Sequence, residues 1–132
     1  MKTAGLHHVA INVHELQPAL DFYVGQLGFS VVESRPDFGF PGAWLQAGDH
    51  QIHLMEVPSA TIDRGQHLAL RVPDLESAVA DLEAAGVKVR VSGYVAGAGR
   101  QAFLRDPSGN RIELNQPDTA GSPTPVIWPA SR

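Results

Sequence analysis

The chain has 132 residues, a formal net charge of -4 and no cysteine, and 43% of its residues are hydrophobic while 18% are charged. This composition is typical of a globular domain, and scattered Lys and Arg residues argue against a nucleic-acid or membrane-surface partner. The lack of cysteine excludes disulfides and thiolate metal ligands, and no apolar run approaches the roughly 20 residues that cross a bilayer. A cytoplasmic location is therefore expected.

An internal repeat organises the chain. The pattern His8-Val9-Ala10-Ile11-Asn12-Val13 recurs as His67-Leu68-Ala69-Leu70-Arg71-Val72. A helical pattern follows each copy, and each half ends on a matching strand, Ile52-His53-Leu54 or Ile112-Glu113-Leu114. The repeat predicts two related modules.

The first module reads in order as strand, helix and three strands. Alternating apolar residues predict a strand at residues 8–13, with His8 on its more polar face. Helical spacing follows over residues 16–27 and ends at Gly28. Further strands are predicted at 29–33, 43–47 and 51–57, with an aromatic loop at 35–42 and a hairpin turn at 48–50.

The second module repeats this order. A strand at residues 66–72 leads to a helix at 75–85, which Asp74 is expected to cap. Three more strands are predicted at 87–91, 100–105 and 111–116, with a glycine-rich loop at 92–99 and a turn at 106–110.

The predicted divisions are a first module at 1–58, a linker at 59–65, a second module at 66–116 and a proline-rich tail at 117–132. Val126-Ile127-Trp128 in the tail either packs on the body or a second subunit, or belongs to a disordered segment. The fold class is α+β: two βαβββ modules sharing one curved mixed sheet, with helices on the outer face and a cupped site on the other.

Four polar side chains fall at equivalent places in the two modules. His8 and His67 open the first strand of each module, while His53 and Glu113 lie within the last strand. If a pseudo-twofold axis relates the modules, the four side chains converge on one point. Three imidazoles and a carboxylate suit a divalent Zn, Ni, Co, Fe or Mn ion, and His8, His67 and Glu113 alone match the ligand set of non-haem iron.

A single histidine on a sheet face is more often a hydrogen-bonded polar residue than a metal ligand. The repeat favours the metal interpretation, because chance does not place polar residues at equivalent sites. The other histidines, His7, His14 and His50, are predicted at the surface, with His7 facing away from His8.

Four segments carry a resemblance to a known family: Leu6-His7-His8-Val9-Ala10-Ile11, then Asp21-Phe22-Tyr23 with Leu27-Gly28-Phe29, then His67-Leu68-Ala69-Leu70, and residues 103–114. Over about residues 6–116 the chain resembles the vicinal oxygen chelate superfamily, which includes glyoxalase I, fosfomycin-resistance thiol transferases, extradiol dioxygenases and metal-free bleomycin-binding proteins.

By position, the resemblance implies that His8, His53, His67 and Glu113 are the metal ligands. The family's metal chelates two adjacent substrate oxygens as a Lewis acid. In the glyoxalase-like reaction, a glutamate at the position of Glu113 moves a proton between two carbons. His53 stands where glyoxalase I usually has Glu or Gln, so its implied roles are ligand or second base.

The first hypothesis is a metal-dependent lyase or isomerase of glyoxalase-I-like type, with Glu113 and His53 catalytic and a small-molecule substrate with two adjacent oxygens. The alternatives are a metal-free small-ligand (antibiotic) binding protein and an extradiol-type dioxygenase. The resemblance also implies a homodimer, because short members often complete the metal site across two chains. Whether one chain or two complete it stays open.

The loop at residues 38–45 resembles one in glyoxalase-I-like proteins. Its aromatic side chains are candidates for a pocket wall, and Arg35, Arg71 or Arg100 for binding a carboxylate or phosphate. The alternative is core packing for the aromatics and a solvated surface for the arginines.

Overall fold

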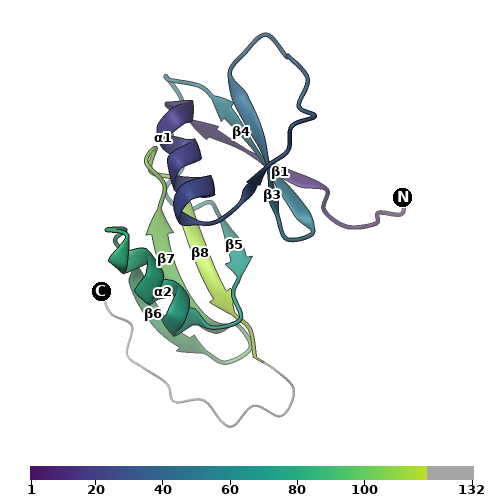
Figure 1. Cartoon of the computed structure of the whole chain (residues 1–132). Coiled ribbons are helices and arrows are strands. Elements are labelled where there is room, and N and C mark those ends of the chain that lie inside the picture. Colours follow the sequence, from purple (N-terminus) through teal and green to yellow (C-terminus); the bar gives the residue numbers. More distant parts are fainter. Residues whose placement is uncertain (119–132) are drawn as a thin grey trace. The chain divides into compact units, whose positions relative to one another are not determined.

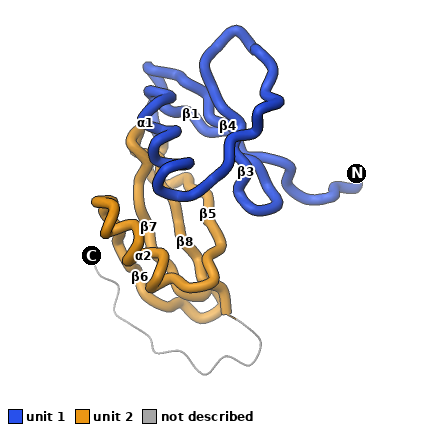
Figure 2. The backbone as a smooth tube through the Cα atoms, in the orientation of Figure 1, with its two compact units in different colours: residues 1–62 blue, residues 63–132 orange. Residues whose placement is uncertain are grey.

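The computed structural model describes residues 1–118 of the chain. Contacts divide the chain into two compact units, unit 1 at residues 1–62 and unit 2 at residues 63–132 (Figure 2). The dividing point falls within the segment 59–65 that the sequence marked as a linker. The expectation for Val126-Ile127-Trp128 lies outside the described residues.

Unit 1 has a sheet of four strands in the order β1-β4-β3-β2, in which β1 and β4 are parallel and the other pairs antiparallel (Figure 1). The elements of unit 1 are β1 (His8–Val13), α1 (Leu16–Leu20), the π-helical segment η1 (Asp21–Gln26), β2 (Ser30–Val31), β3 (Gly42–Ala47) and β4 (His50–Glu56).

Unit 2 repeats this topology in the strand order β5-β8-β7-β6, with β5 and β8 parallel. The elements of unit 2 are β5 (His67–Arg71), α2 (Leu75–Ala84), β6 (Arg90–Val95), β7 (Gly99–Arg105) and β8 (Arg111–Gln116).

The α+β class and the two βαβββ modules are confirmed, but the prediction of one shared sheet is wrong. The hydrogen-bonded strands form two separate four-stranded sheets. The reason is that the first strand of each module pairs with the last strand of the same module, so each module completes its own ladder.

Each unit buries one face of its sheet under its own helix. In unit 2, α2 contacts β7 and β8, and its Leu75 and Val79 are buried, as are Leu104 and Leu114 of the strands. In unit 1, α1 contacts β4, and Ala19, Phe22 and Tyr23 of the helical segment are buried. The alternation of apolar residues along the strands therefore sets the core face, as the sequence predicted.

Three elements differ clearly from prediction, and the first is the strand at 29–33, which is only Ser30–Val31 in the structure. The helix at 16–27 is α-helical only to Leu20 and π-helical from Asp21, with Leu27 N–H bonded to Phe22 O at 2.9 Å. The strand predicted at 87–91 begins later, because β6 spans Arg90–Val95, and residues 92–95 of the expected glycine-rich loop are therefore strand. Gly93 (φ 92°) sits at a register shift in β6, which explains a glycine inside a strand.

The first backbone N–H group of α1 and that of α2 are hydrogen-bonded in the same way. Leu16 N–H donates to Glu56 Oε2, and Leu75 N–H donates to Gln116 Oε1, each at 2.8 Å. In both units, the last residue of the closing strand therefore satisfies a free amide at the start of the helix. Asp74 also accepts the Ser77 N–H at 3.2 Å, which confirms it as the N-cap.

Among the described residues, no helix combines the length and apolar character that crossing a membrane requires.

Candidate functional site

The two predicted ligands of unit 1 lie in direct contact. His8 opens the edge strand β1 and His53 lies in the middle of the neighbouring strand β4. Their rings stack with centroids 3.9 Å apart and planes 11° apart. His8 is exposed, whereas His53 is only 9% exposed. The pair therefore presents two imidazoles on one face of the sheet.

The stack continues onto the third strand. Trp44 of β3 is the register partner of His53, and the two rings stack at 4.5 Å and 11°. Phe38 lies 6.0 Å from Trp44, and the guanidinium of Arg35 lies 5.1 Å from the centre of the Phe38 ring. An aromatic wall thus runs from the 35–42 loop to His8.

His53 has a polar partner and a shifted pKa. Its Nε2 lies 2.8 Å from Gln51 Oε1, and since an amide oxygen only accepts, Nε2–H donates in this arrangement. Burial lowers the pKa of His53 below 6.5, and the nearby His8, His7 and Arg35 lower it further. His53 is consequently a neutral imidazole with Nδ1 as its basic nitrogen near neutral pH.

Unit 2 presents the other two predicted residues on β5 and β8. The Nδ1 of His67 lies 2.9 Å from the backbone oxygen of Gly65, so Nδ1–H donates and Nε2 is the ring nitrogen left for another partner. Metal-binding histidines are commonly oriented by such a bond to a backbone carbonyl. Glu113 is 7% exposed, and its register partners are Ala69 on β5 and Phe103 on β7.

The two pairs occupy the same register. Ala10 of β1 faces His53, two residues after His8, and Ala69 of β5 faces Glu113, two residues after His67. In both units, the first member opens the parallel edge strand and the second lies mid-way along a central strand. The equivalence that the sequence repeat suggested therefore holds within each unit.

Burial sets His53 and Glu113 apart from most other polar residues, whereas the other two predicted ligands, His8 and His67, are exposed. The buried polar side chains among residues 1–118 are His53, Asp106 and Glu113. Asp106 has a structural role, because its carboxylate accepts the N–H groups of Ser108 and Asn110 at 2.9 Å and closes the predicted turn. The other two are the residues that the repeat places at equivalent positions.

The structure brings the four predicted ligands together as two pairs, His8 with His53 in unit 1, and His67 and Glu113 on adjacent strands in unit 2. Within the part of the chain that the structure describes, no group of three or more His, Asp or Glu side chains is arranged to hold a metal ion. Metal binding by the four residues remains a prediction.

The other histidines depart from expectation in two cases. His7 is exposed as predicted, but its Nδ1 lies 2.9 Å from Nδ1 of His8, so it does not face away from that ring. His14 is half-buried, with Nε2 2.8 Å from Ala60 O, whereas His50 is exposed.

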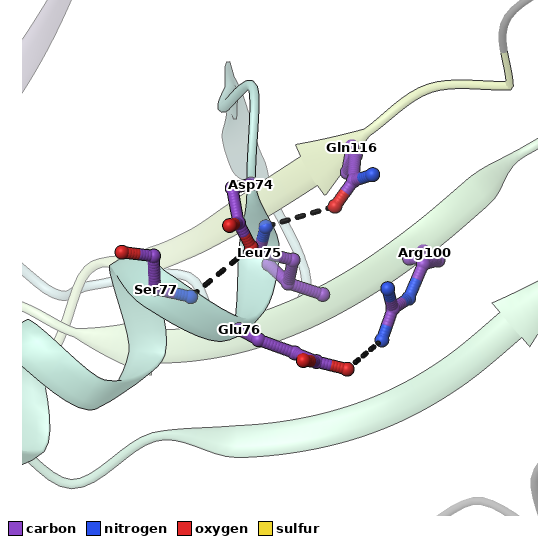
Figure 3. Close-up of polar contacts among 6 residues, drawn as sticks. All are labelled: Asp74, Leu75, Glu76, Ser77, Arg100 and Gln116. Carbon is purple, nitrogen blue, oxygen red and sulfur yellow. Dashed lines mark hydrogen bonds and ion pairs between the residues drawn. The ribbon is translucent and has the colours of Figure 1, made fainter.

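The three arginines that were candidates for binding an anion have different surroundings in the structure. Arg100 forms an ion pair with Glu76 at 2.8 Å (Figure 3). Arg35 donates to Phe40 O at 3.1 Å and stacks against the aromatic loop. Arg71 ends β5 and is exposed.

Trp44 belongs to the loop whose aromatic side chains were candidates for a pocket wall, but its stacking on His53 was not predicted, nor were the contacts of Gln51 and of the Gly65 carbonyl. The two-residue turn at Gly48 and Asp49 places Trp44 opposite His53, so the hairpin register carried a signal for this contact. Gln51 shares the strand face of His53 by alternation. No sequence signal marks the Gly65 carbonyl.

A family model described as the Glyoxalase/Bleomycin resistance protein/Dioxygenase superfamily matches residues 5–114. The uncharacterized protein YaeR of Escherichia coli (strain K12) is 33% identical over 122 residues, which cover 83% of this chain and 93% of YaeR. Glyoxylase I 4 of Arabidopsis thaliana is 27% identical over 120 residues, covering 83% of this chain and 68% of the plant protein.

Among solved structures, TnmS3, an antibiotic binding protein from Streptomyces sp. CB03234, superposes with a TM-score of 0.77 at 29% identity. The match covers 89% of this chain and 99% of TnmS3.

Proposed function

The chain belongs to the glyoxalase/bleomycin resistance/dioxygenase superfamily, and from this premise we propose that it is a metal-dependent lyase or isomerase of glyoxalase-I-like type. Its substrate would be a small molecule with two adjacent oxygens. The similarity to Glyoxylase I 4 supports an enzyme of this type.

The observation that carries the proposal is the equal placement of two ligand-type pairs, His8 with His53 and His67 with Glu113. We propose that these four side chains hold one divalent ion, Zn, Ni, Co, Fe or Mn. Nitrogen and carboxylate donors without thiolate fit ions of this class. The bond from His67 to Gly65 O supports the assignment, because it occupies Nδ1 and leaves Nε2 as the ring nitrogen available to a metal.

A bound ion would act as a Lewis acid on the two substrate oxygens. The protein's own part is proton transfer. Glu113 removes a proton from the carbon next to the substrate carbonyl and returns it to the neighbouring carbon, so the carboxylate is regenerated. Its low exposure keeps bulk water from competing for that proton.

His53 is the residue at which this chain departs from glyoxalase I. Its lowered pKa keeps the imidazole neutral near neutral pH. A neutral imidazole suits either proposed role, since metal ligation and proton acceptance both need a free lone pair.

The second candidate is a small-ligand binding protein without catalysis. The stack of Trp44 on His53, with Phe38 beside it, favours this candidate, because aromatic walls bind planar ligands. The similarity to the antibiotic binding protein TnmS3 points the same way. We also propose a homodimer, as expected for short members of the superfamily.

Metal analysis separates the two candidates. Protein purified without added metal should carry one divalent ion per site, and His67→Ala should remove it, while the control His50→Ala on an exposed residue should retain it. Metal content unchanged in His67→Ala would exclude the metal site. Iron as the bound metal would favour an extradiol-type dioxygenase over a lyase.

The direct assay follows the loss of hemithioacetal formed from methylglyoxal and a thiol. Turnover that is lost in His67→Ala but not in His50→Ala supports the lyase. Inactivity with several thiols would exclude glyoxalase I activity.

A further inference from the structure

Unit 2 also has a pocket whose lining includes none of the four predicted ligands. This pocket of about 1010 Å³ opens where β6, β7 and β8 approach the end of α2. Its lining includes the basic residues Lys88, Arg90, Arg105 and Arg111, the aromatic ring of Phe103 and the carboxylate of Glu83. All of these residues belong to one unit, so the pocket is a property of that unit alone.

This pocket is positively charged, whereas the chain as a whole is negatively charged. The whole protein has a net charge of -4 and ten Lys and Arg residues, yet four of these ten line one pocket with a single carboxylate. Among residues 1–118 the ion pair is Arg100 with Glu76, and none of the four pocket cations pairs with a carboxylate. Within residues 1–118, no ion pair therefore neutralises their positive charge.

The guanidinium groups are held by an aromatic ring instead. The Cζ of Arg111 lies 4.2 Å and that of Arg90 5.4 Å from the centre of the Phe103 ring. Stacking on a ring holds a guanidinium in place while leaving its N–H groups free to donate at the edge. Two arginines on the same ring thus offer several N–H donors within a small volume.

The strand register adds a like-charge pair. Arg105 of β7 is the direct cross-strand partner of Arg111 of β8, and like charges at such positions are destabilising. Arg105 donates to the Gly109 carbonyl at 2.9 Å, which keeps it beside the turn rather than extended into solvent. An anion bound between the two arginines would remove the repulsion.

The same ring also links the pocket to the predicted ligand His67. Phe103 contacts His67 edge-on, with ring centroids 5.8 Å apart. Phe103 is also the register partner of Glu113. The basic pocket and the second ligand pair therefore share one strand face.

We propose that this pocket binds an anionic oxygen group, phosphate or carboxylate, of a small molecule. This assignment rests on the proposed function: the anionic group is the charged end of the substrate, whose reacting end lies toward His67 and Glu113. Arginine recognises both groups through paired N–H donors.

The test uses the full chain after EDTA treatment, so that its outcome does not depend on the metal. Inorganic phosphate, pyrophosphate and citrate are titrated in low-salt buffer by calorimetry and by ¹H–¹⁵N NMR. Binding should shift the amides of residues 103–111. A preference for pyrophosphate over citrate identifies a phosphorylated ligand, and the reverse preference a carboxylate.

Arg111→Gln should weaken the binding at least tenfold, while Arg64→Gln, the same charge change at an exposed residue outside the pocket, should leave it within twofold. Equal weakening in both variants, or no saturable binding of any of the three anions by the unmodified chain, would overturn the proposal.

Circular dichroism checks the fold of Arg111→Gln, and the exposed Lys88→Gln offers a second pocket variant that does not disturb the Phe103 stack. Lys88→Gln should weaken the binding severalfold. If metal content or turnover fails while anion binding persists, the proposed function is wrong and the pocket stands.

Discussion

The imidazoles of His8 and His53 stack face to face at 3.9 Å, although 44 residues separate them in the sequence. Parallel pairing of β1 with β4 brings them together, and the partner ring of Trp44 completes a stack across three strands. The pKa of His53 therefore reports on its burial and on the charge of the neighbouring side chains.

The pKa of His53 should lie below 6.5 in the metal-free protein. Burial is its largest cause and the charge of His8 the next, so His8→Gln should raise the pKa but leave it below 6.5. An NMR titration of the imidazole measures both. A pKa in His8→Gln at or above 6.5 would contradict burial as the main cause.

The same shift makes stability depend on pH. Between the folded-state pKa and 6.5, the unfolded chain binds a proton at His53 that the folded chain does not. The free energy of unfolding should therefore fall as pH drops below 6.5, and the loss is complete below the folded-state pKa. Urea denaturation of His53→Gln should show a weaker dependence on pH over this window.

Glu113→Gln should separate ligation from proton transfer. An amide cannot accept a proton as a carboxylate does, so kcat should fall about 10²-fold or more. The amide of Glu113→Gln keeps an oxygen donor at this position whereas His67→Ala leaves no donor, so the metal content should fall less in Glu113→Gln. Full activity in Glu113→Gln, with metal bound, would remove the proton-transfer role.

The start of α2 offers a matched set of stability measurements (Figure 3). Asp74→Ala removes the N-cap bond to Ser77 and should lower the free energy of unfolding by about 1 kcal/mol. Gln116→Ala removes the acceptor of the Leu75 N–H, with a loss of about 1 kcal/mol. Glu76→Ala is the control, because its pair with Arg100 is 75% exposed on the glutamate side and should contribute less than about 0.5 kcal/mol.

Two glycines of unit 1 should respond oppositely to alanine. A Cβ at Gly42 would collide with the carbonyl oxygen of Leu54, so Gly42→Ala should destabilise the protein by about 1–3 kcal/mol. Gly25 lies in η1 with nothing within 4 Å of a Cβ and no positive φ. Gly25→Ala should therefore stabilise by about 0.5–1 kcal/mol in thermal or urea unfolding.

Much of each module could be predicted because it depends on local periodicity. Alternation placed His8 and His53 away from the apolar face, and the helix starts at Leu16 and Leu75 followed from short-range signals. The glycine loop was misread, because a bulge at Gly93 allows a strand where composition indicates a turn.

The sequence by itself determined two related βαβββ modules, their core faces and the equivalence of the pair His8 and His53 with the pair His67 and Glu113. Only the tertiary structure decided that the modules form separate sheets, that Trp44 stacks on His53 and that Arg90 and Arg111 share the ring of Phe103. Periodicity fixes which face a side chain occupies, whereas its neighbours depend on the register between strands that are distant in the sequence.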